Sequence, residues 1–236
     1  MNPVDHLAAA LKAVDWEKNI AEFLKHARAP STIAAANLRL ALWSKEFEQI
    51  EKGNPALSFI RSMQAAGHQV AALLSLGLYN AAAGSIRQVF ESALYYTYFR
   101  RHPAELATLV TSSTYYATKQ EVIDYHKLHS SKFSECEKKL GLVAKLGDWY
   151  KSTSAVVHGQ IPGTWISHKG LAEISFHRGT LEVAVSQFEL GEELVHHLFL
   201  CTSGREVWHD VSTSAKKKLV SGLSGDVKTT LKLDTA

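Results

Sequence analysis

The chain has few of the residues that mark secreted or irregular proteins. Its 236 residues include two cysteines and five prolines. Cys136 and Cys201 lie far apart and in no pair motif, so a reducing compartment is the simpler interpretation, while a single disulfide between them stays open. No uncharged apolar run is long enough to span a bilayer, since the best candidate, residues 70–78, is too short.

A strong charge and a recognisable targeting segment are also absent. The formal net charge of +3 permits nucleic acid as a partner but does not predict it. The first residues, MNPVDH, contain no basic region followed by an apolar run, so we expect no secretory signal. Alanine and leucine are plentiful, which favours helix. We therefore expect a helical, cytoplasmic protein with no membrane association.

Apolar residues recur at helical spacing along most of the chain. The predicted helices cover residues 3–27, with a break near Asp15, and residues 33–50, 55–78, 81–101, 104–128, 133–140, 148–158 and 181–200. Thr180 is expected to cap the last of these. The helices at 55–78 and 81–101 are joined by a short connection, so they are expected to form an antiparallel helical hairpin.

The sequence pattern changes between Thr164 and Gly179. Two short apolar segments flank His168-Lys169-Gly170, which predicts a hairpin of two strands at about 164–177. The expected fold class is therefore mainly all-α, a helical bundle with a small β-hairpin inserted before its last long helix. We expect N-terminal helices that pack on or flank the bundle (1–54), the bundle itself (55–207) and a flexible basic tail (208–236).

Three polar side chains fall together near the end of one predicted helix. Residues 150–158 are followed by Gly159, which is typical of a helix end. Lys151 and His158 are seven positions apart, nearly two turns, so they share a face with Ser154 between them. The plainer interpretation is a histidine that stabilises the negative end of the helix dipole.

A second polar set lies on the helix predicted at 81–101. Arg87 and Glu91 are four positions apart and therefore stack on one face, where most such pairs are solvated and worth roughly 0.2–0.5 kcal/mol. Here they belong to a stripe that also contains Gly84, Tyr95 and Tyr98. A stripe that mixes glycine and tyrosine with charge favours a face turned toward another helix or a cleft.

The sequence does not favour a metal, a nucleotide cofactor or a serine nucleophile. Asp124, His126 and His129 have weak spacing for a metal site, and Glu193-Leu-Val-His196 matches one half of a di-iron site. No glycine-rich phosphate loop is present, and Ser154 lies in no nucleophile elbow. We expect neither a cofactor nor a metal.

The two polar sets together resemble the HEPN superfamily, and more narrowly the bacterial HEPN-like families found beside toxin and phage-defence genes. The resemblance rests on Arg-x-x-x-Glu (Arg87, Glu91) followed by a later helix that ends Ser-x-x-x-His-Gly (Ser154, His158, Gly159). It covers about residues 65–200. It implies a helical bundle that dimerises and, in many members, a metal-independent ribonuclease with an Arg-x(4–6)-His motif that leaves a cyclic phosphate.

The resemblance also implies roles for residues of this chain. His158 would be the general acid and base, Lys151 and Arg87 would stabilise the phosphate charge, Glu91 would orient Arg87, and Ser154 would donate a supporting hydrogen bond. Lys151 stands where the family motif has arginine, and lysine lacks the planar fork that suits a phosphate. The implied partners are a second copy of the chain, RNA, and an antitoxin or defence-system protein.

A different class of function stays open beside the ribonuclease. Arg87, Glu91 and His158 could form a buried polar network in a non-catalytic interaction module. A catalytic site requires His158, Lys151 and Arg87 to open into a common cleft, whereas the network would be buried under Trp165 and the hairpin. A third interpretation, a small-molecule pocket near Tyr95, Tyr98 and Trp149, has no specific motif.

Overall fold

The computed structural model describes residues 2–161, 163–166 and 168–233, and it is built from helices connected by turns and loops. No strand occurs in these ranges, so the all-α fold class is confirmed. In chain order the α-helices are α1 (Pro3–Ala13), α2 (Trp16–Lys25), α3 (Ala29–Ile50), α4 (Leu57–Ser75), α5 (Tyr79–Phe99), α6 (Pro103–Thr111), α7 (Lys119–His129), α8 (Phe133–Leu140), α9 (Leu142–Val157), α10 (Arg178–Cys201), α11 (Ser203–Glu206), α12 (Thr213–Leu219) and α13 (Gly225–Leu231).

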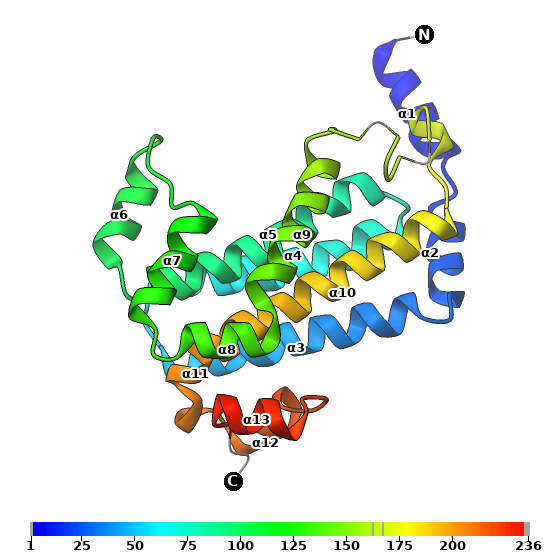
Figure 1. Ribbon diagram of the computed structural model, residues 1–236. Coiled ribbons are helices and arrows are strands. Elements are labelled where there is room, and N and C mark those ends of the chain that lie inside the picture. Colours follow the sequence, from blue (N-terminus) through cyan, green and yellow to red (C-terminus); the bar gives the residue numbers. More distant parts are fainter. Residues whose placement is uncertain (1, 162, 167, 234–236) are drawn as a thin grey trace.

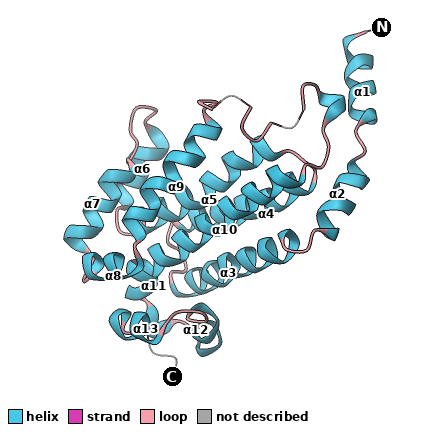
Figure 2. Cartoon of the chain, turned by 45° about the vertical axis from the view of Figure 1, so that its right-hand side comes forward, coloured by secondary structure: helices cyan, strands magenta, loops and turns pink. Residues whose placement is uncertain are grey.

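Four long helices form the centre of the bundle (Figure 1). Helix α4 packs along α5 as the predicted hairpin, and α10 packs against both α5 and α3. α3 completes the set by packing on α4. Leu40, Trp43 and Phe47 of α3 are fully buried in the same core as the later helices, so the bundle begins well before residue 55. Helix α9 packs across α5 and α10 (Figure 2).

The break predicted near Asp15 separates α1 from α2. Asp15 is the N-cap of α2, and its carboxylate accepts the Lys18 backbone N–H over 2.9 Å. Helix α1 buries none of its residues and lies beside the 3₁₀ turn at Leu171–Glu173. The predicted helix at 104–128 is interrupted, because residues 112–118 form a loop and Thr118 begins α7 with a capping box to Glu121.

The predicted β-hairpin at 164–177 is wrong within the described residues. This segment is a loop that contains the 3₁₀ turn Leu171–Glu173, while Pro162 and Ser167 lie outside the described residues. Its end is held by side chains rather than by a second strand: Phe176 N–H donates to Asn19 Oδ1 and His177 N–H donates to the Tyr79 hydroxyl, each over 2.9 Å. Helix α10 consequently begins at Arg178, with His177 rather than Thr180 as its N-cap.

The segment predicted as a flexible basic tail instead carries two short helices as far as residue 233. Leu219 of α12 and Leu231 of α13 are buried in the core. The Ser212 backbone N–H and hydroxyl both donate to the carboxylate of Glu46, which fixes α12 beside α3. The few apolar residues of this segment are hidden among lysines and serines, so composition alone suggests a tail. No helix among the described residues is both long and apolar enough to cross a membrane.

Candidate functional site

Helices α5 and α9 bring Arg87, Glu91 and His158 into direct contact. The Arg87 guanidinium donates from Nε to Glu91 Oε1 over 2.7 Å, and its Nη1 lies 2.9 Å from His158 Nε2. Its third nitrogen, Nη2, donates to the Tyr150 hydroxyl over 2.6 Å, and this hydroxyl donates to the same Glu91 oxygen over 2.7 Å. We call these four residues the Arg87 cluster.

The position of α9 follows from a close contact with α10. The indole of Trp149 lies against Gly191, where an added Cβ would come within 2.6 Å of Trp149 Cζ2. Trp149 Nε1 donates to the Gln187 carbonyl over 2.9 Å, and the ring lies 5.6 Å from that of Phe90. Tyr150 is the next residue along α9, so its direction toward Arg87 is set by this anchor.

The protonation state of His158 can be read from its partner. A guanidinium has five N–H donors and no acceptor, so His158 Nε2 must be the acceptor in this contact. The imidazole is then neutral and carries its proton on Nδ1. A neutral imidazole with an exposed edge is the form that can accept a proton from another molecule.

Arg87 and Tyr150 have shifted pKa values. Burial acts to lower the pKa of Arg87, but the hydrogen bond and the charge of Glu91 outweigh this effect. The pKa is therefore raised, and Arg87 stays protonated. Burial and the hydrogen bond to Glu91 raise the pKa of Tyr150 to about 12, so its hydroxyl keeps its proton. The guanidinium carbon also lies 4.7 Å from the centre of the Tyr150 ring, within cation–π range.

The structure does not bring Lys151 and Ser154 into this cluster. Lys151 is exposed and makes no hydrogen bond or ion pair with any residue that the structure describes. The Ser154 hydroxyl is buried and has no hydrogen-bond partner within the described chain. The helical spacing that placed both residues near His158 was sound, but neither side chain contacts it.

A small pocket adjoins the Arg87 cluster, and we call it the tyrosine pocket. It has a volume of about 280 Å³ and is lined by Arg87, Glu91, Leu94 and Tyr95 of α5, by residues 116–119, and by Tyr150 of α9. The ammonium of Lys119 lies 4.6 Å from the centre of the Tyr150 ring. Tyr150, Lys119 and Tyr116 were not among the expected site residues. Tyr150 directly precedes Lys151, which was an expected site residue.

Neither expectation for this site is met in full, because the Arg87 cluster is not buried but the pocket beside Arg87 is lined by neither Lys151 nor His158. His158 is exposed, and the side chains of Arg87 and Glu91 retain 20% and 38% of their accessible surface. Trp165 is buried, but no hairpin covers the cluster in the described part of the chain. The stripe on α5 does face a cleft, as predicted for Arg87, Glu91 and Tyr95.

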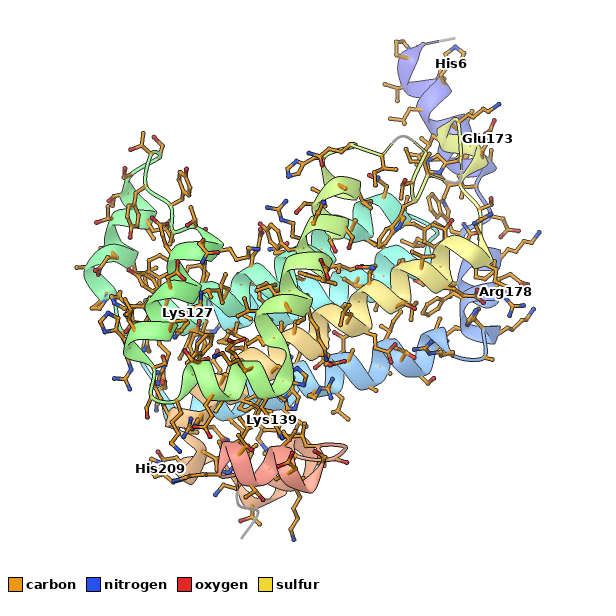
Figure 3. The ribbon with its side chains drawn as sticks, in the orientation of Figure 1. His6, Lys127, Lys139, Glu173, Arg178 and His209 are labelled. Carbon is orange, nitrogen blue, oxygen red and sulfur yellow. The ribbon has the colours of Figure 1, made fainter. Side chains whose placement is uncertain are left out.

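The other histidines that drew attention have structural roles. His126 is buried between the hydroxyls of Ser130 and Thr97, at 2.8 and 2.9 Å. His196 is buried and accepts the Trp43 indole N–H over 3.0 Å. A second Glu-x-x-His, Glu206 to His209, lies at the surface, where Figure 3 labels His209. His209 Nε2 lies 3.1 Å from Asp210 Oδ2. The described residues contain no group of three or more histidine, cysteine, aspartate or glutamate side chains placed to hold a metal.

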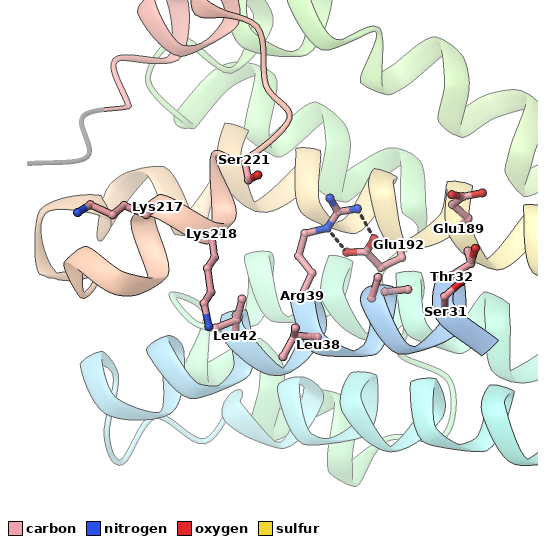
Figure 4. A pocket seen from close by; sticks show the side chains of 12 residues that line it. Ser31, Thr32, Leu38, Arg39, Leu42, Glu189, Glu192, Lys217, Lys218 and Ser221 are labelled. Carbon is pink, nitrogen blue, oxygen red and sulfur yellow. Dashed lines mark hydrogen bonds and ion pairs between the residues drawn. The ribbon is translucent and has the colours of Figure 1, made fainter. Parts of the chain in front are cut away.

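A larger pocket lies elsewhere, between α3, α10 and α12 (Figure 4). Its volume is about 790 Å³, and Arg39 of α3 forms a two-pronged ion pair there with Glu192 of α10. Burial raises the pKa of Glu192 although Arg39 opposes the shift. Because Arg39 and Glu192 are paired with each other, these two charges offer little to a reacting ligand.

Comparison with known proteins adds no relative. The chain matches no family model, and no curated protein and no solved structure matches it.

Proposed function

We propose that this protein is a HEPN-like, metal-independent endoribonuclease that acts in a toxin or phage-defence system. One observation carries the proposal: an exposed neutral imidazole, His158, is held by an arginine that is itself fixed by Glu91 and Tyr150. A proton acceptor and a phosphate-binding cation are then available side by side, without a metal ligand set.

Arg87 supplies the guanidinium that the motif position of this chain lacks. Three of its five N–H bonds are used within the cluster, so Nη1 and Nη2 each retain one for a phosphate oxygen. A planar guanidinium can present both to one phosphate, which the ammonium of Lys151 cannot do. Lys151 is proposed to act at a distance, as an exposed positive charge near the RNA backbone.

The reaction uses these groups as follows. His158 Nε2 accepts the proton of an RNA 2′-hydroxyl as the 2′-oxygen attacks the adjacent phosphorus. Arg87 turns its Nη1 donor from His158 to the phosphate, where negative charge develops. The bond from phosphorus to the 5′-oxygen breaks, and this oxygen leaves as a hydroxyl after taking a proton from water. His158 returns its proton to solvent, and the products carry a 2′,3′-cyclic phosphate and a 5′-hydroxyl.

A second copy of the chain is proposed to pack near the end of α9. Val157 and Ile161 flank His158, and they expose 38% and 52% of their surface. Exposed apolar residues beside a polar site are a common feature of interfaces. The same surface would serve an antitoxin or defence-system partner that silences the enzyme in the cytoplasm.

The experiment that tests the function is RNA cleavage by the purified protein in the presence of EDTA. We expect cleavage by the wild type and by Arg178→Lys, a surface substitution on α10 outside the cluster. His158→Ala at matched folding should lose it. Cleavage that EDTA abolishes, or that His158→Ala retains, contradicts the proposal.

One observation favours a second candidate, the non-catalytic interaction module. All three nitrogens of the Arg87 guanidinium have partners in the chain, as they would in a purely structural link between α5 and α9. On this account His158→Ala lowers stability, and the wild type cleaves none of the RNAs offered. The exposure of His158 is the reason we prefer the enzyme.

A further inference from the structure

The tyrosine pocket has features that the cleavage chemistry alone does not need. Arg87, Glu91 and Tyr150 belong to both the pocket and the Arg87 cluster, whereas Tyr95, Tyr116 and Lys119 line the pocket without belonging to the cluster. His158 itself is not among the residues that line the pocket. A pocket of aromatic and cationic side chains beside a phosphate site calls for a ligand with both a flat ring and a phosphate.

We infer that the tyrosine pocket binds the base of an unpaired nucleotide whose phosphate lies at Arg87. This inference rests on the proposed function for its substrate class, RNA, and adds where the base goes. Single-stranded nucleic acids are bound by aromatic side chains on which bases stack, combined with cations that follow the backbone. Three tyrosines, one arginine and one lysine supply both elements here.

The three tyrosines are held to different degrees. Tyr95 is fixed by edge-on contacts with Phe59 and Phe99, with ring centres 5.5 Å apart in both cases. Tyr150 is fixed by Arg87 and Glu91. Tyr116 is 68% exposed and makes no ring contact or hydrogen bond with the described residues. It stands on the loop between α6 and α7, so it can close over a base without disturbing the bundle.

The size and polarity of the pocket limit the occupant. At about 280 Å³ it falls just below the usual range of about 300–1,000 Å³ for small-molecule sites, so one base fits better than a stacked pair. Glu91 Oε1 is occupied by Arg87 and Tyr150, whereas Oε2 has no partner in the described chain. This oxygen can accept an N–H from the edge of the base, as carboxylates do elsewhere.

Lys119 places a second cation at the pocket. Its ammonium lies 4.6 Å from the Tyr150 ring centre, while Arg87 is 4.7 Å from the same centre. Two cations therefore face one tyrosine ring, and Glu91 is paired with the first of them, Arg87. A strand with one phosphate at Arg87 therefore meets a second cation at the pocket.

The test measures binding separately from cleavage. A fluorescently labelled, single-stranded 2′-O-methyl oligonucleotide cannot be cleaved through its 2′-oxygen, so its Kd reports binding alone. We expect Tyr116→Ala to weaken binding about 5- to 150-fold and Tyr116→Phe to restore it, because stacking of one base contributes about 1–3 kcal/mol. Val110→Ala, which truncates an exposed residue of α6, is the matched control and should leave the Kd unchanged.

An oligonucleotide of the same length without bases distinguishes stacking from charge. Its Kd should be weaker than that of the normal oligonucleotide, and Tyr116→Ala should not change it further. The inference is overturned if Tyr116→Ala leaves the normal Kd unchanged, if it weakens both oligonucleotides equally, or if neither binds. Binding through Tyr116 without any RNA cleavage would instead refute the proposed function alone, and His158-dependent cleavage with no effect of Tyr116→Ala would refute this inference alone.

Discussion

Arg87 and His158 are 71 positions apart in the chain, yet the guanidinium Nη1 lies 2.9 Å from the imidazole Nε2. The contact joins the middle of α5 to the residue that ends α9. It fixes His158 as a neutral acceptor, because a guanidinium can only donate. The contact therefore links two helices and holds together the two groups on which the proposed cleavage depends.

If Arg87 rather than Lys151 stabilises the phosphate, the two cations should respond differently to substitution. We expect Arg87→Lys to lower kcat/KM for RNA about 100- to 1,000-fold, the usual effect of losing a donor to developing charge. Lys151→Ala should lower it less than about tenfold, since Lys151 contributes only an exposed charge. Steady-state cleavage of one RNA at matched ionic strength compares the two. A larger effect of Lys151→Ala than of Arg87→Lys would show that Lys151, at the motif position, stabilises the phosphate.

Glu91 is expected to act through Arg87. Glu91→Gln keeps the shape of the side chain but removes the charge that receives Arg87 Nε and the Tyr150 hydroxyl. Hydrogen bonds to charged groups contribute about 1.5–3 kcal/mol, so we expect kcat to fall about 10- to 100-fold. The KM should change less, because the substrate still meets Arg87. A rise in KM with kcat unchanged would indicate that Glu91 contributes to base binding only.

Two glycines provide a matched pair for stability. Gly191→Ala would drive a Cβ into the buried Trp149 ring, and overpacking of this kind costs about 1–3 kcal/mol. Gly147→Ala, in the exposed part of α9, meets nothing and should stabilise the helix by about 0.5–1 kcal/mol. Urea unfolding gives both values. Equal stability of the two variants would show that Trp149 does not anchor α9 against α10.

Acid should destabilise the fold through its buried histidines. The pKa of His126 is lowered to about 4, first by burial and then by the charges of Arg100 and His102. Between pH 4 and the usual value of about 6.5, the unfolded state binds more protons than the folded state, so stability rises with pH. The stability that neutral His126 contributes is fully present above about pH 6.5 and is lost as the pH falls toward 4. His197, whose pKa is also lowered to about 4 by burial, adds to the same slope.

The variant His126→Gln isolates the first contribution. Near pH 7 the wild type should be more stable, because His126 bonds to Ser130 and Thr97. Near pH 4 this difference should shrink by about 3 kcal/mol, since the variant has no imidazole to protonate. Free energies of unfolding at both pH values test this. A difference that stays constant with pH would contradict it.

The sequence predicted the helices well, because their apolar spacing reflects burial. Phe47 of α3 and Leu74 of α4 have no exposed surface, as their spacing indicates, although Leu38 of α3, which shares that spacing, is 57% exposed. The segment after α9 was mispredicted for the opposite reason. Its backbone is held by Asn19 and Tyr79, which are more than 90 positions away. The local alternation of apolar and polar residues cannot reveal such distant partners.

The candidate site was predicted in part for similar reasons. Arg87 and Glu91 are neighbours on one helix, and Glu91 is where the spacing places it. Their contact with His158 depends on the crossing of α5 and α9, which motif resemblance suggested and spacing could not. Tyr150 and Tyr116 were missed because tyrosines on amphipathic helices and loops carry no distinct signal. Ser154 was grouped with His158 by helix geometry that fixes backbone proximity but not side-chain contact.

The central claim is that His158 and Arg87 cleave RNA through its own 2′-hydroxyl. Analysis of the product ends in the presence of EDTA tests this most directly. We predict 2′,3′-cyclic phosphate and 5′-hydroxyl ends from the wild type, none from His158→Ala at matched folding, and no cut where the 2′-hydroxyl is replaced by hydrogen. Products with 5′-phosphate ends, cleavage at 2′-deoxy positions, or the same products from His158→Ala would contradict the account.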